Sequence, residues 1–264
     1  MLVKRWTKKT LFLLRFWLSK TNNPLFIGYY KHVYRPKKGS LSEKLDALSK
    51  SKSSPLFVLQ VGANDGISND PVHKFIKRDK WKGLLIEPQG LVFRNYLQKI
   101  YQKDPEIEVL HAAIGSKSDT LPLYKLGFCE DRWATGLASF NKEHLVRAIQ
   151  SGEVQRQCRK NGITFPDKQS TQITTEEVSV CTVQEILKKY QISNIDLLMI
   201  DVESLDFEIV KLFLPEIEPE HIIYEHEHLS DEDIIKCMDL LKRKRYTLQT
   251  FGSNTWATKT ALSE

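Results

Sequence analysis

Short apolar runs alternate with segments of helical periodicity from residue 56 onward. Such runs are typical of strands that are buried on both faces of a sheet. They are LFVLQV (56–61), GLLIE (83–87), IEVLHAAIG (107–115), IDLLMID (195–201) and HIIYEH (221–226). Between them, apolar residues recur at helical spacing in DPVHKFIKRDKW (70–81), GLVFRNYLQKIYQ (90–102), TVQEILKKYQI (182–192), SLDFEIVKLFL (204–214) and SDEDIIKCMDLLKRK (230–244). This alternation predicts an α/β fold with a doubly wound, mostly parallel sheet.

Two segments depart from the alternation. Residues 245–259 contain two strand-like stretches around Gly252, which predicts a C-terminal antiparallel hairpin. Residues 125–175 are polar and irregular, with helical periodicity in 141–160. Long insertions in compact domains are usually functional or disordered, so a substrate lid and a solvated insertion both stay open. We divide the chain into an N-terminal segment, residues 1–54, and a domain of residues 55–264 that carries this insertion.

The N-terminal twenty residues are basic and aromatic. On a helix, one broad face carries Leu2, Trp6, Leu13, Leu14, Trp17 and Leu18, and the other carries Lys4, Arg5, Lys8, Lys9 and Arg15 together with Phe12 and Phe16. Because Arg15 interrupts the apolar run, neither a signal peptide nor a membrane span is expected. Residues 1–20 are therefore predicted either to contact an anionic membrane surface or to pack on their own domain or on a dimer partner.

The charge of the chain favours anionic partners. The 264 residues carry a formal net charge of +6 and a pI near 9.0, which suits phosphates, nucleic acid or an anionic membrane. The four cysteines, at 129, 158, 181 and 237, lack the spacing of a metal or redox motif. Their number and spacing indicate reduced thiols in a cytoplasmic protein, with peripheral contact at the inner membrane surface as a further expectation.

The turn after the first strand, VGANDG (61–66), contains two glycines. In doubly wound sheets, ligands bind beyond the carboxyl ends of the strands, and glycine permits a sharp turn or the close approach of a ligand. The spacing fits neither the dinucleotide fingerprint nor a Walker loop. Glu87 ends the second strand about twenty residues later, where a carboxylate accepts hydrogen bonds from ribose hydroxyls. These features predict a nucleoside pocket, although Glu87 could instead cap the following helix.

With these residues, the chain resembles the FkbM family of S-adenosylmethionine-dependent methyltransferases. The resemblance rests on VGANDG (61–66), IEPQ (86–89), HAAIGS (111–116), LPLY (121–124) and LLMIDVESLDFEIVK (197–211), and it covers about residues 55–230. It implies a class I methyltransferase, Rossmann-like fold and O-methylation, typically of sugar or polyketide-type hydroxyls. We expect the acceptor of this chain to be a hydroxyl of a carbohydrate or a glycolipid-type molecule.

The resemblance also implies roles for single residues. Those expected to hold S-adenosylmethionine are Gly62, Ala63, Asn64 and Gly66 at its methionine part, Glu87 at the ribose, and Ala112 and Ala113 at the adenine. Asp201 and Glu203 match the acidic pair of the family's I-D-V-E-G run, in which Ser204 replaces the glycine. The family commonly has an acidic residue at the position of Gln60, so Asp65 is expected to take over its role.

Methyl transfer to a hydroxyl requires alignment of the acceptor oxygen and removal of its proton. Asp201 and EHEH (225–228) follow two neighbouring strands, so Asp201, Glu203 and His226 are the expected catalytic residues. Two mechanisms stay open. Mg²⁺ held by Asp201 with Glu225 or His226 could activate the hydroxyl, or His226 or His228 could act as the general base. Because side chains alternate along a strand, we expect Glu225 and Glu227 on one side and the two histidines on the other; a solvated strand end is the third interpretation.

Other functions remain as alternatives. A NAD-dependent oxidoreductase is disfavoured because the turn lacks the third glycine. A nucleic-acid methyltransferase is suggested by the charge, but much of the basic excess lies in residues 1–38 instead of across a groove, so nucleic acid is not an expected partner. Another small-molecule acceptor and a non-catalytic scaffold complete the alternatives, and the sequence leaves the oligomeric state open.

Overall fold

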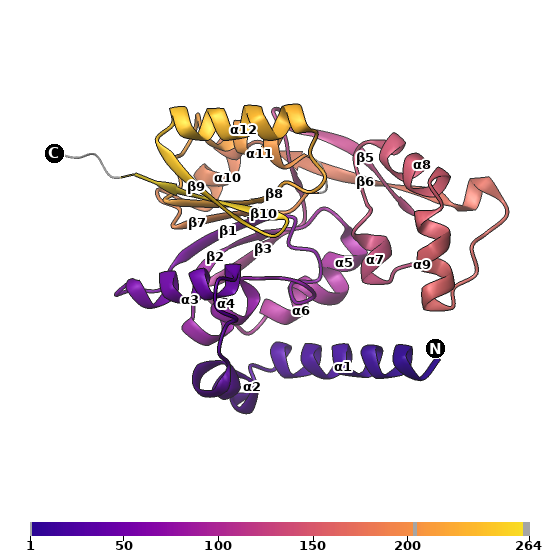
Figure 1. Cartoon of the computed structure of the whole chain (residues 1–264), viewed down its shortest axis with the longest axis horizontal. Helices are drawn as coiled ribbons and strands as arrows, with labels where there is room; N and C mark the ends of the chain where they lie inside the picture. Colours follow the sequence, from indigo (N-terminus) through magenta and orange to yellow (C-terminus); the bar gives the residue numbers. More distant parts are fainter. Residues whose placement is uncertain (1, 203–204, 261–264) are drawn as a thin grey trace.

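The computed structural model describes the backbone of residues 2–202 and 205–260, and their side chains from Thr10 onward. Its centre is a seven-stranded sheet with the order β3-β2-β1-β7-β8-β10-β9 (Figure 1). The strands are β1 (Phe57–Val61), β2 (Lys82–Ile86), β3 (Ile107–Leu110), β7 (Leu197–Ile200), β8 (His221–Glu225), β9 (Tyr246–Phe251) and β10 (Asn254–Lys259). The first five of this order are parallel, and β10 runs antiparallel to both β8 and β9. The predicted doubly wound sheet with a C-terminal hairpin is confirmed.

Helices cover both faces of the sheet, as Figure 1 shows. One face is packed by α3 (Leu41–Ser51), α4 (His73–Asp79) and α6 (Gln98–Tyr101), and the other by α10 (Val183–Lys189), α11 (Asp206–Phe213) and α12 (Asp231–Arg243). Neighbouring residues of β1 serve opposite faces: Val58 packs with the first group and Leu59 with the second, and neither is exposed. Burial on both faces explains why the strands read as continuous apolar runs.

Several element boundaries differ from the prediction. The helix expected from residue 70 begins at His73, and Asp70 Oδ1 accepts the N–H groups of Val72 and His73 at 2.7 and 3.0 Å. The helix expected over 90–102 is made of α5 (Gly90–Val92), a π-helical turn, η2 (Phe93–Leu97), and α6. The strand expected over 107–115 ends at Leu110, because β4 (Ala113–Ile114) pairs in a second sheet.

This second sheet carries the insertion. It has the order β4-β6-β5, with β5 (Asp119–Leu126) and β6 (Ile173–Cys181) forming an antiparallel pair. Between them lie α7 (Arg132–Thr135), α8 (Lys142–Gln150), α9 (Glu153–Asn161) and the 3₁₀ turn η3 (Gln169–Thr171). The single helical stretch expected over 141–160 is therefore two helices, which meet at Gly152 with a φ of +75°. The insertion has its own apolar core, in which Leu126, Leu145, Val154 and Cys158 are buried, so it is not a solvated loop.

The N-terminal segment packs on the domain through one face. It forms α1 (Leu2–Lys20), α2 (Pro24–Gly28) and a π-helical turn, η1 (Tyr29–Val33). The rings of Phe12 and Phe16 each lie 5.7 Å from the Tyr96 ring, and Ser19 Oγ lies 3.1 Å from His73 Nε2. Packing of α1 on its own domain, one of the two predictions, is thus observed for this face. In the described part of the chain, no helix combines the length and the apolar character needed to cross a bilayer.

Candidate active site

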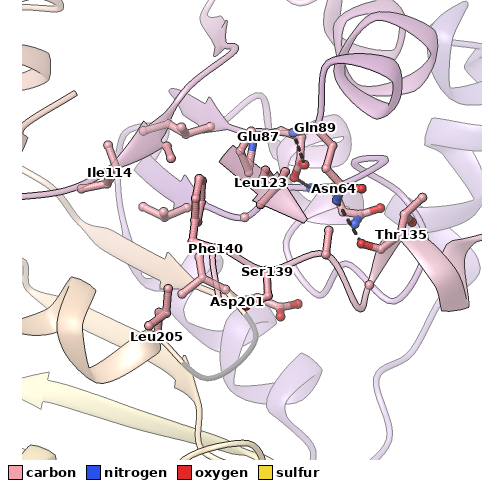
Figure 2. Close-up of a pocket in the computed structure, with 18 of the residues that line it drawn as sticks. Asn64, Glu87, Gln89, Ile114, Leu123, Thr135, Ser139, Phe140, Asp201 and Leu205 are labelled. Carbon is pink, nitrogen blue, oxygen red and sulfur yellow. Dashed lines mark hydrogen bonds between the residues drawn. The ribbon is translucent and has the colours of Figure 1, made fainter. Parts of the chain in front are cut away.

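Two adjoining cavities lie at the carboxyl ends of the parallel strands, at the point where the strand order reverses between β1 and β7. This position is the usual ligand site of a doubly wound sheet. The narrow cavity is lined by Gly62 and Asn64 after β1, Glu87 after β2, Asp201 after β7, and residues of the insertion (Figure 2). The wide cleft, with a volume of about 890 Å³, opens beside Asp201 and Glu225.

Gly62 is required by the approach of one chain segment to another. Its φ is +84°, and a Cβ atom placed there would lie 1.9 Å from the backbone oxygen of Asp201. Gly66 has a φ of +70°, and its Cβ would lie 2.7 Å from Leu97 Cδ1. Gly66 therefore packs against the helical segment after β2 and does not line the narrow cavity. The glycines shape the turn, and Gly62 brings it against the end of β7.

Gly62→Ala is expected to destabilise the fold by roughly 3 kcal/mol or more, because the new methyl group collides with backbone and φ is positive. The matched control is Gly152→Ala, where φ is +75° but no heavy atom lies within 4 Å of the added Cβ. That variant carries the left-handed strain alone, which costs about 1–2 kcal/mol. Urea unfolding measures both, and equal losses in the two variants would contradict the assigned contact.

The remaining residues of the turn are divided between the cavity and the turn itself. Asn64 lines the cavity with a φ of +48°. Asp65 Oδ1 accepts the N–H groups of Ile67 at 3.0 Å and Ser68 at 2.7 Å, and Ala63 is buried in the core. Asp65 thus stabilises its own turn, and neither it nor Ala63 lines the cavity. The expectation that Asp65 takes over the role of an acidic residue at position 60 is not supported.

The surroundings of position 60 explain why it holds a glutamine instead of an acidic residue. Its side chain is buried, and Nε2 donates to Asp70 Oδ2 at 3.3 Å. Burial raises the pKa of Asp70. An acidic residue at position 60 would face the Asp70 carboxylate, and two buried carboxylates at one site repel each other. The amide of Gln60 avoids this conflict by donating a hydrogen bond.

Glu87 presents a buried carboxylate to the narrow cavity. It is 2 % exposed, Oε2 accepts the N–H of Asn64 at 2.7 Å, and Oε1 accepts the N–H of Gln89 at 2.9 Å. Burial raises its pKa to about 7, against the lowering effect of these hydrogen bonds and of the Arg132 guanidinium. The contact with Gln89 shows that Glu87 also caps the segment before α5. Each carboxylate oxygen keeps a second lone pair, which is the acceptor pattern that two vicinal hydroxyls require.

Apolar side chains make up much of the rest of the narrow cavity. It is lined by Ile86, Ala112, Ala113, Ile114, Leu123 and Phe140. Figure 2 shows the Phe140 side chain projecting into this space from the insertion. Gln89 Nε2 donates to the backbone oxygen of Thr135 at 3.0 Å, which ties the insertion to the rim. A buried carboxylate beside an apolar slot fits an adenosine group.

Asp201 lies where the two cavities meet and lines both. Burial and the neighbouring Glu225 carboxylate raise its pKa to about 6, and the positive charges of Arg132 and His228 oppose this shift. Its backbone N–H donates to Val61 O at 3.0 Å, which fixes the end of β7 against β1. A carboxylate with this pKa is largely ionised at neutral pH and still basic enough to accept a proton.

The EHEH segment is arranged differently from the prediction. The strand ends at Glu225, so alternation does not continue, and both Glu225 and His228 line the wide cleft. His226 Nδ1 lies 3.0 Å from Thr255 Oγ1, and its backbone N–H donates to Ser253 O. His226 thus faces the hairpin and lines neither cavity, and its catalytic role stays a prediction. Glu203 lies outside the described residues.

The predicted Mg²⁺ site of Asp201, Glu225 and His226 is not supported. His226 is engaged with Thr255, and residues 2–202 and 205–260 contain no group of three or more His, Cys, Asp or Glu side chains placed to hold a metal ion. Of the residues expected to bind the cofactor, Gly62, Asn64, Glu87, Ala112 and Ala113 line the narrow cavity.

Several residues of the insertion that line the wide cleft were not predicted from the sequence. Arg132, Trp133, His144 and Arg147 line the wide cleft. Three of their polar atoms, Arg132 Nε, Trp133 Nε1 and His144 Nε2, are buried and have no hydrogen-bond partner in the described structure. Buried polar atoms are normally paired. The only available signal was the concentration of Arg, His and Trp in an irregular segment, which is too weak to place them at a site.

Comparison with known proteins identifies the family of the chain. A model of the methyltransferase FkbM domain matches residues 60–248. No curated protein matches the chain. An FkbM methyltransferase from Methylobacillus flagellatus is 13% identical with a TM-score of 0.47, and the match covers 88% of this chain and 50% of that one. The chain thus spans half the length of this structure.

Two human structures show weaker likeness. The methyltransferase 10 domain containing protein is 10% identical with a TM-score of 0.39, covering 88% of this chain and 78% of that one. The N-terminal domain of METTL16 in complex with SAH is 11% identical with a TM-score of 0.41, covering 85% and 70%. Because the family model spans most of the chain, including every strand end that forms the narrow cavity, the chain belongs to the FkbM family of methyltransferases.

Proposed function

We propose that this methyltransferase transfers the methyl group of S-adenosylmethionine to a hydroxyl of a carbohydrate or glycolipid-type acceptor. The observation that carries the proposal is the junction of the two cavities. A carboxylate, Asp201, stands between a slot whose apolar walls and buried carboxylate suit adenosine and a wide cleft lined by Arg132, Trp133, His144 and Arg147. An acceptor in the cleft therefore reaches the same carboxylate that borders the cofactor.

Different residues of the narrow cavity suit different regions of the cofactor. Glu87 accepts hydrogen bonds from the ribose hydroxyls, and the slot between Ala112, Ala113 and Phe140 encloses the adenine. The backbone after Gly62 borders the end toward Asp201. When bound, the cofactor supplies a methyl group that is already activated as a sulfonium.

Asp201 is the candidate general base. The acceptor hydroxyl donates a hydrogen bond to its carboxylate, which aligns the oxygen and takes its proton as the methyl is transferred. The Glu225 carboxylate raises the pKa of Asp201 and so increases its basicity. Arg132 lies near Asp201 and Glu87 and holds both carboxylates toward their charged forms.

The wide cleft suits a polyhydroxylated acceptor. The polar side chains of Arg132, His144 and Arg147 line this cleft and supply hydrogen-bonding groups for sugar hydroxyls. The Trp133 ring also offers an apolar surface to the C–H face of a sugar. These residues come from the insertion, and this supports its role as the substrate-binding part of the domain. A lid motion and a cytoplasmic location stay predictions, as does any role for Mg²⁺.

The test is mass spectrometry of glycan, glycolipid and nucleic acid fractions incubated with the protein and isotopically labelled methyl donor. His144→Ala and Trp133→Ala should raise the acceptor KM about 10-fold or more, because each removes a side chain that lines the wide cleft, while the affinity for S-adenosylhomocysteine stays within about twofold. Arg156→Ala, on the neighbouring helix α9 and outside the cleft lining, is the control. Label found only in nucleic acid fractions, or an unchanged KM in both variants, would overturn the acceptor assignment.

A further inference from the structure

The N-terminal segment leaves a set of large apolar side chains in solvent. Of the nine exposed large apolar residues in the described part of the chain, seven lie between residues 11 and 33. They are Leu11, Leu13, Leu14 and Trp17 on α1, and Leu25, Tyr29 and Val33 on α2 and η1. We call these seven residues the N-terminal apolar face. Their exposed fractions range from 50% to 83%, and exposed apolar groupings of this kind mark interaction sites.

Packing of α1 explains why this face points away from the domain. Phe12, Phe16 and Ser19 contact Tyr96 and His73. These three positions share one side of a helix, and Leu14 and Trp17 lie on the opposite side. Figure 1 shows α1 and α2 together along one edge of the molecule, outside the helix layer formed by α3, α4 and α6.

The charged residues of the same segment are all positive. Residues 1–42 contain ten Lys and Arg and neither Asp nor Glu. Because the whole chain carries +6, residues 1–42 carry +10 and residues 43–264 carry −4. Several of these cations border the apolar face, and Lys31, Arg35, Lys37 and Lys38 are exposed. The basic character of the protein therefore belongs to this segment alone.

Apolar side chains flanked by cations are what the surface of an anionic bilayer binds. Leucine and tryptophan enter the boundary between headgroups and acyl chains, and Lys and Arg are attracted to anionic lipid headgroups. A second copy of the chain is a poorer occupant. A symmetric dimer would bring the same patch of both protomers together, and with it two segments of +10 each.

We propose that the N-terminal apolar face and its flanking cations bind the surface of an anionic lipid bilayer. The docked α1 is already helical and oriented, so little ordering is needed on binding. The proposed surface is separate from both cavities, since none of the seven residues lines either of them. The proposal is therefore independent of the acceptor's identity.

The experiment is co-sedimentation of the full chain with vesicles of phosphatidylcholine, with and without phosphatidylserine. The wild-type protein should sediment with the anionic vesicles and be released by salt, because salt screens the headgroup charge. The double variant Leu14→Gln/Trp17→Gln should bind these vesicles at least roughly tenfold more weakly than the wild type. Point variants are preferable to truncation, since removal of α1 would also uncover Tyr96 and His73.

The matched control replaces the two exposed large apolar residues outside the segment. Leu121→Gln/Ile235→Gln removes the same kind of side chain from β5 and α12 and should leave vesicle binding unchanged. Wild-type protein that stays in solution with anionic vesicles at low salt would overturn the proposal, as would equal binding of the Leu14/Trp17 variant. If the wild-type protein forms a dimer, does not bind vesicles, and is made monomeric only by Leu14→Gln/Trp17→Gln, the N-terminal apolar face binds a second copy of the chain instead.

Calorimetry with S-adenosylhomocysteine on the same proteins separates this result from the proposed function. All variants should keep the cofactor affinity of the wild type, because the substitutions lie outside the cavities. A variant that loses vesicle binding but keeps its cofactor affinity is altered in the N-terminal apolar face alone, and the proposed function is unaffected by that result.

Discussion

Asp201→Asn is expected to lower kcat by about 10²–10⁴-fold, the usual contribution of a positioned general base. The affinity for S-adenosylhomocysteine should change little, because asparagine has nearly the same size and keeps the backbone contact with Val61. Steady-state kinetics with the acceptor and calorimetry with S-adenosylhomocysteine measure the two effects. A kcat near the wild-type value would remove Asp201 from the chemistry.

The pH profile of kcat/KM for the acceptor adds an independent readout. In the wild-type protein, the Asp201 pKa of about 6 predicts that kcat/KM rises as the pH rises through about 6 and levels off above it, because only the ionised carboxylate accepts a proton. Glu225→Gln removes a negative charge that raises this pKa. The rising limb should therefore move to lower pH in that variant, and a limb that stays in place would show that Asp201 does not set it.

Glu87→Gln is expected to weaken S-adenosylhomocysteine binding by about 30-fold or more, since the charged acceptor of two ribose hydroxyls is replaced by a neutral amide. The wild-type affinity should also depend on pH. The pKa of Glu87 is raised from 4.5 to about 7 in the free protein, and bound ribose favours the ionised form. Affinity should therefore rise with pH up to about 7, by about tenfold per pH unit below that value, and then level off.

This pH dependence should be absent in Glu87→Gln. The stability of the free protein also depends on the ionisation of Glu87, but it changes with pH in the opposite direction to the cofactor affinity. Because the folded-state pKa of Glu87 is above the unfolded value, this group lowers the free energy of unfolding as the pH rises from about 4.5 to about 7. Calorimetry at a series of pH values checks the binding step. A wild-type affinity that is flat between pH 5 and pH 8, at values chosen to bracket the shifted pKa, would contradict the role of Glu87.

The parallel sheet could be predicted from the sequence because the succession of strands and helices along the chain is visible in local patterns. Strands buried on both faces, such as β1 and β7, are continuous apolar runs, and helical periodicity separates them. The site residues at strand ends, Gly62, Glu87 and Asp201, could be predicted for the same reason, since a doubly wound sheet places strand ends together.

The rest of the site depends on tertiary contacts that local patterns do not encode. Arg132 and Phe140 of the insertion line the narrow cavity, and Phe140 packs against buried residues of the second sheet, such as Leu123 and Val178. Asp65 turned out to close its own turn, which short polar residues after a glycine commonly do. The expected alternation of Glu225 to His228 does not hold because β8 ends at Glu225, and the His226 ring contacts Thr255 of β10.

A crystal structure of the protein with S-adenosylhomocysteine will show whether the narrow cavity binds the adenosyl part of the methyl donor. We expect both ribose hydroxyls to contact the Glu87 carboxylate, with the adenine between Ala112, Ala113 and Phe140 and the sulfur on the side of Asp201. S-Adenosylhomocysteine bound elsewhere, or with its ribose away from Glu87, would rule out the proposed cofactor site.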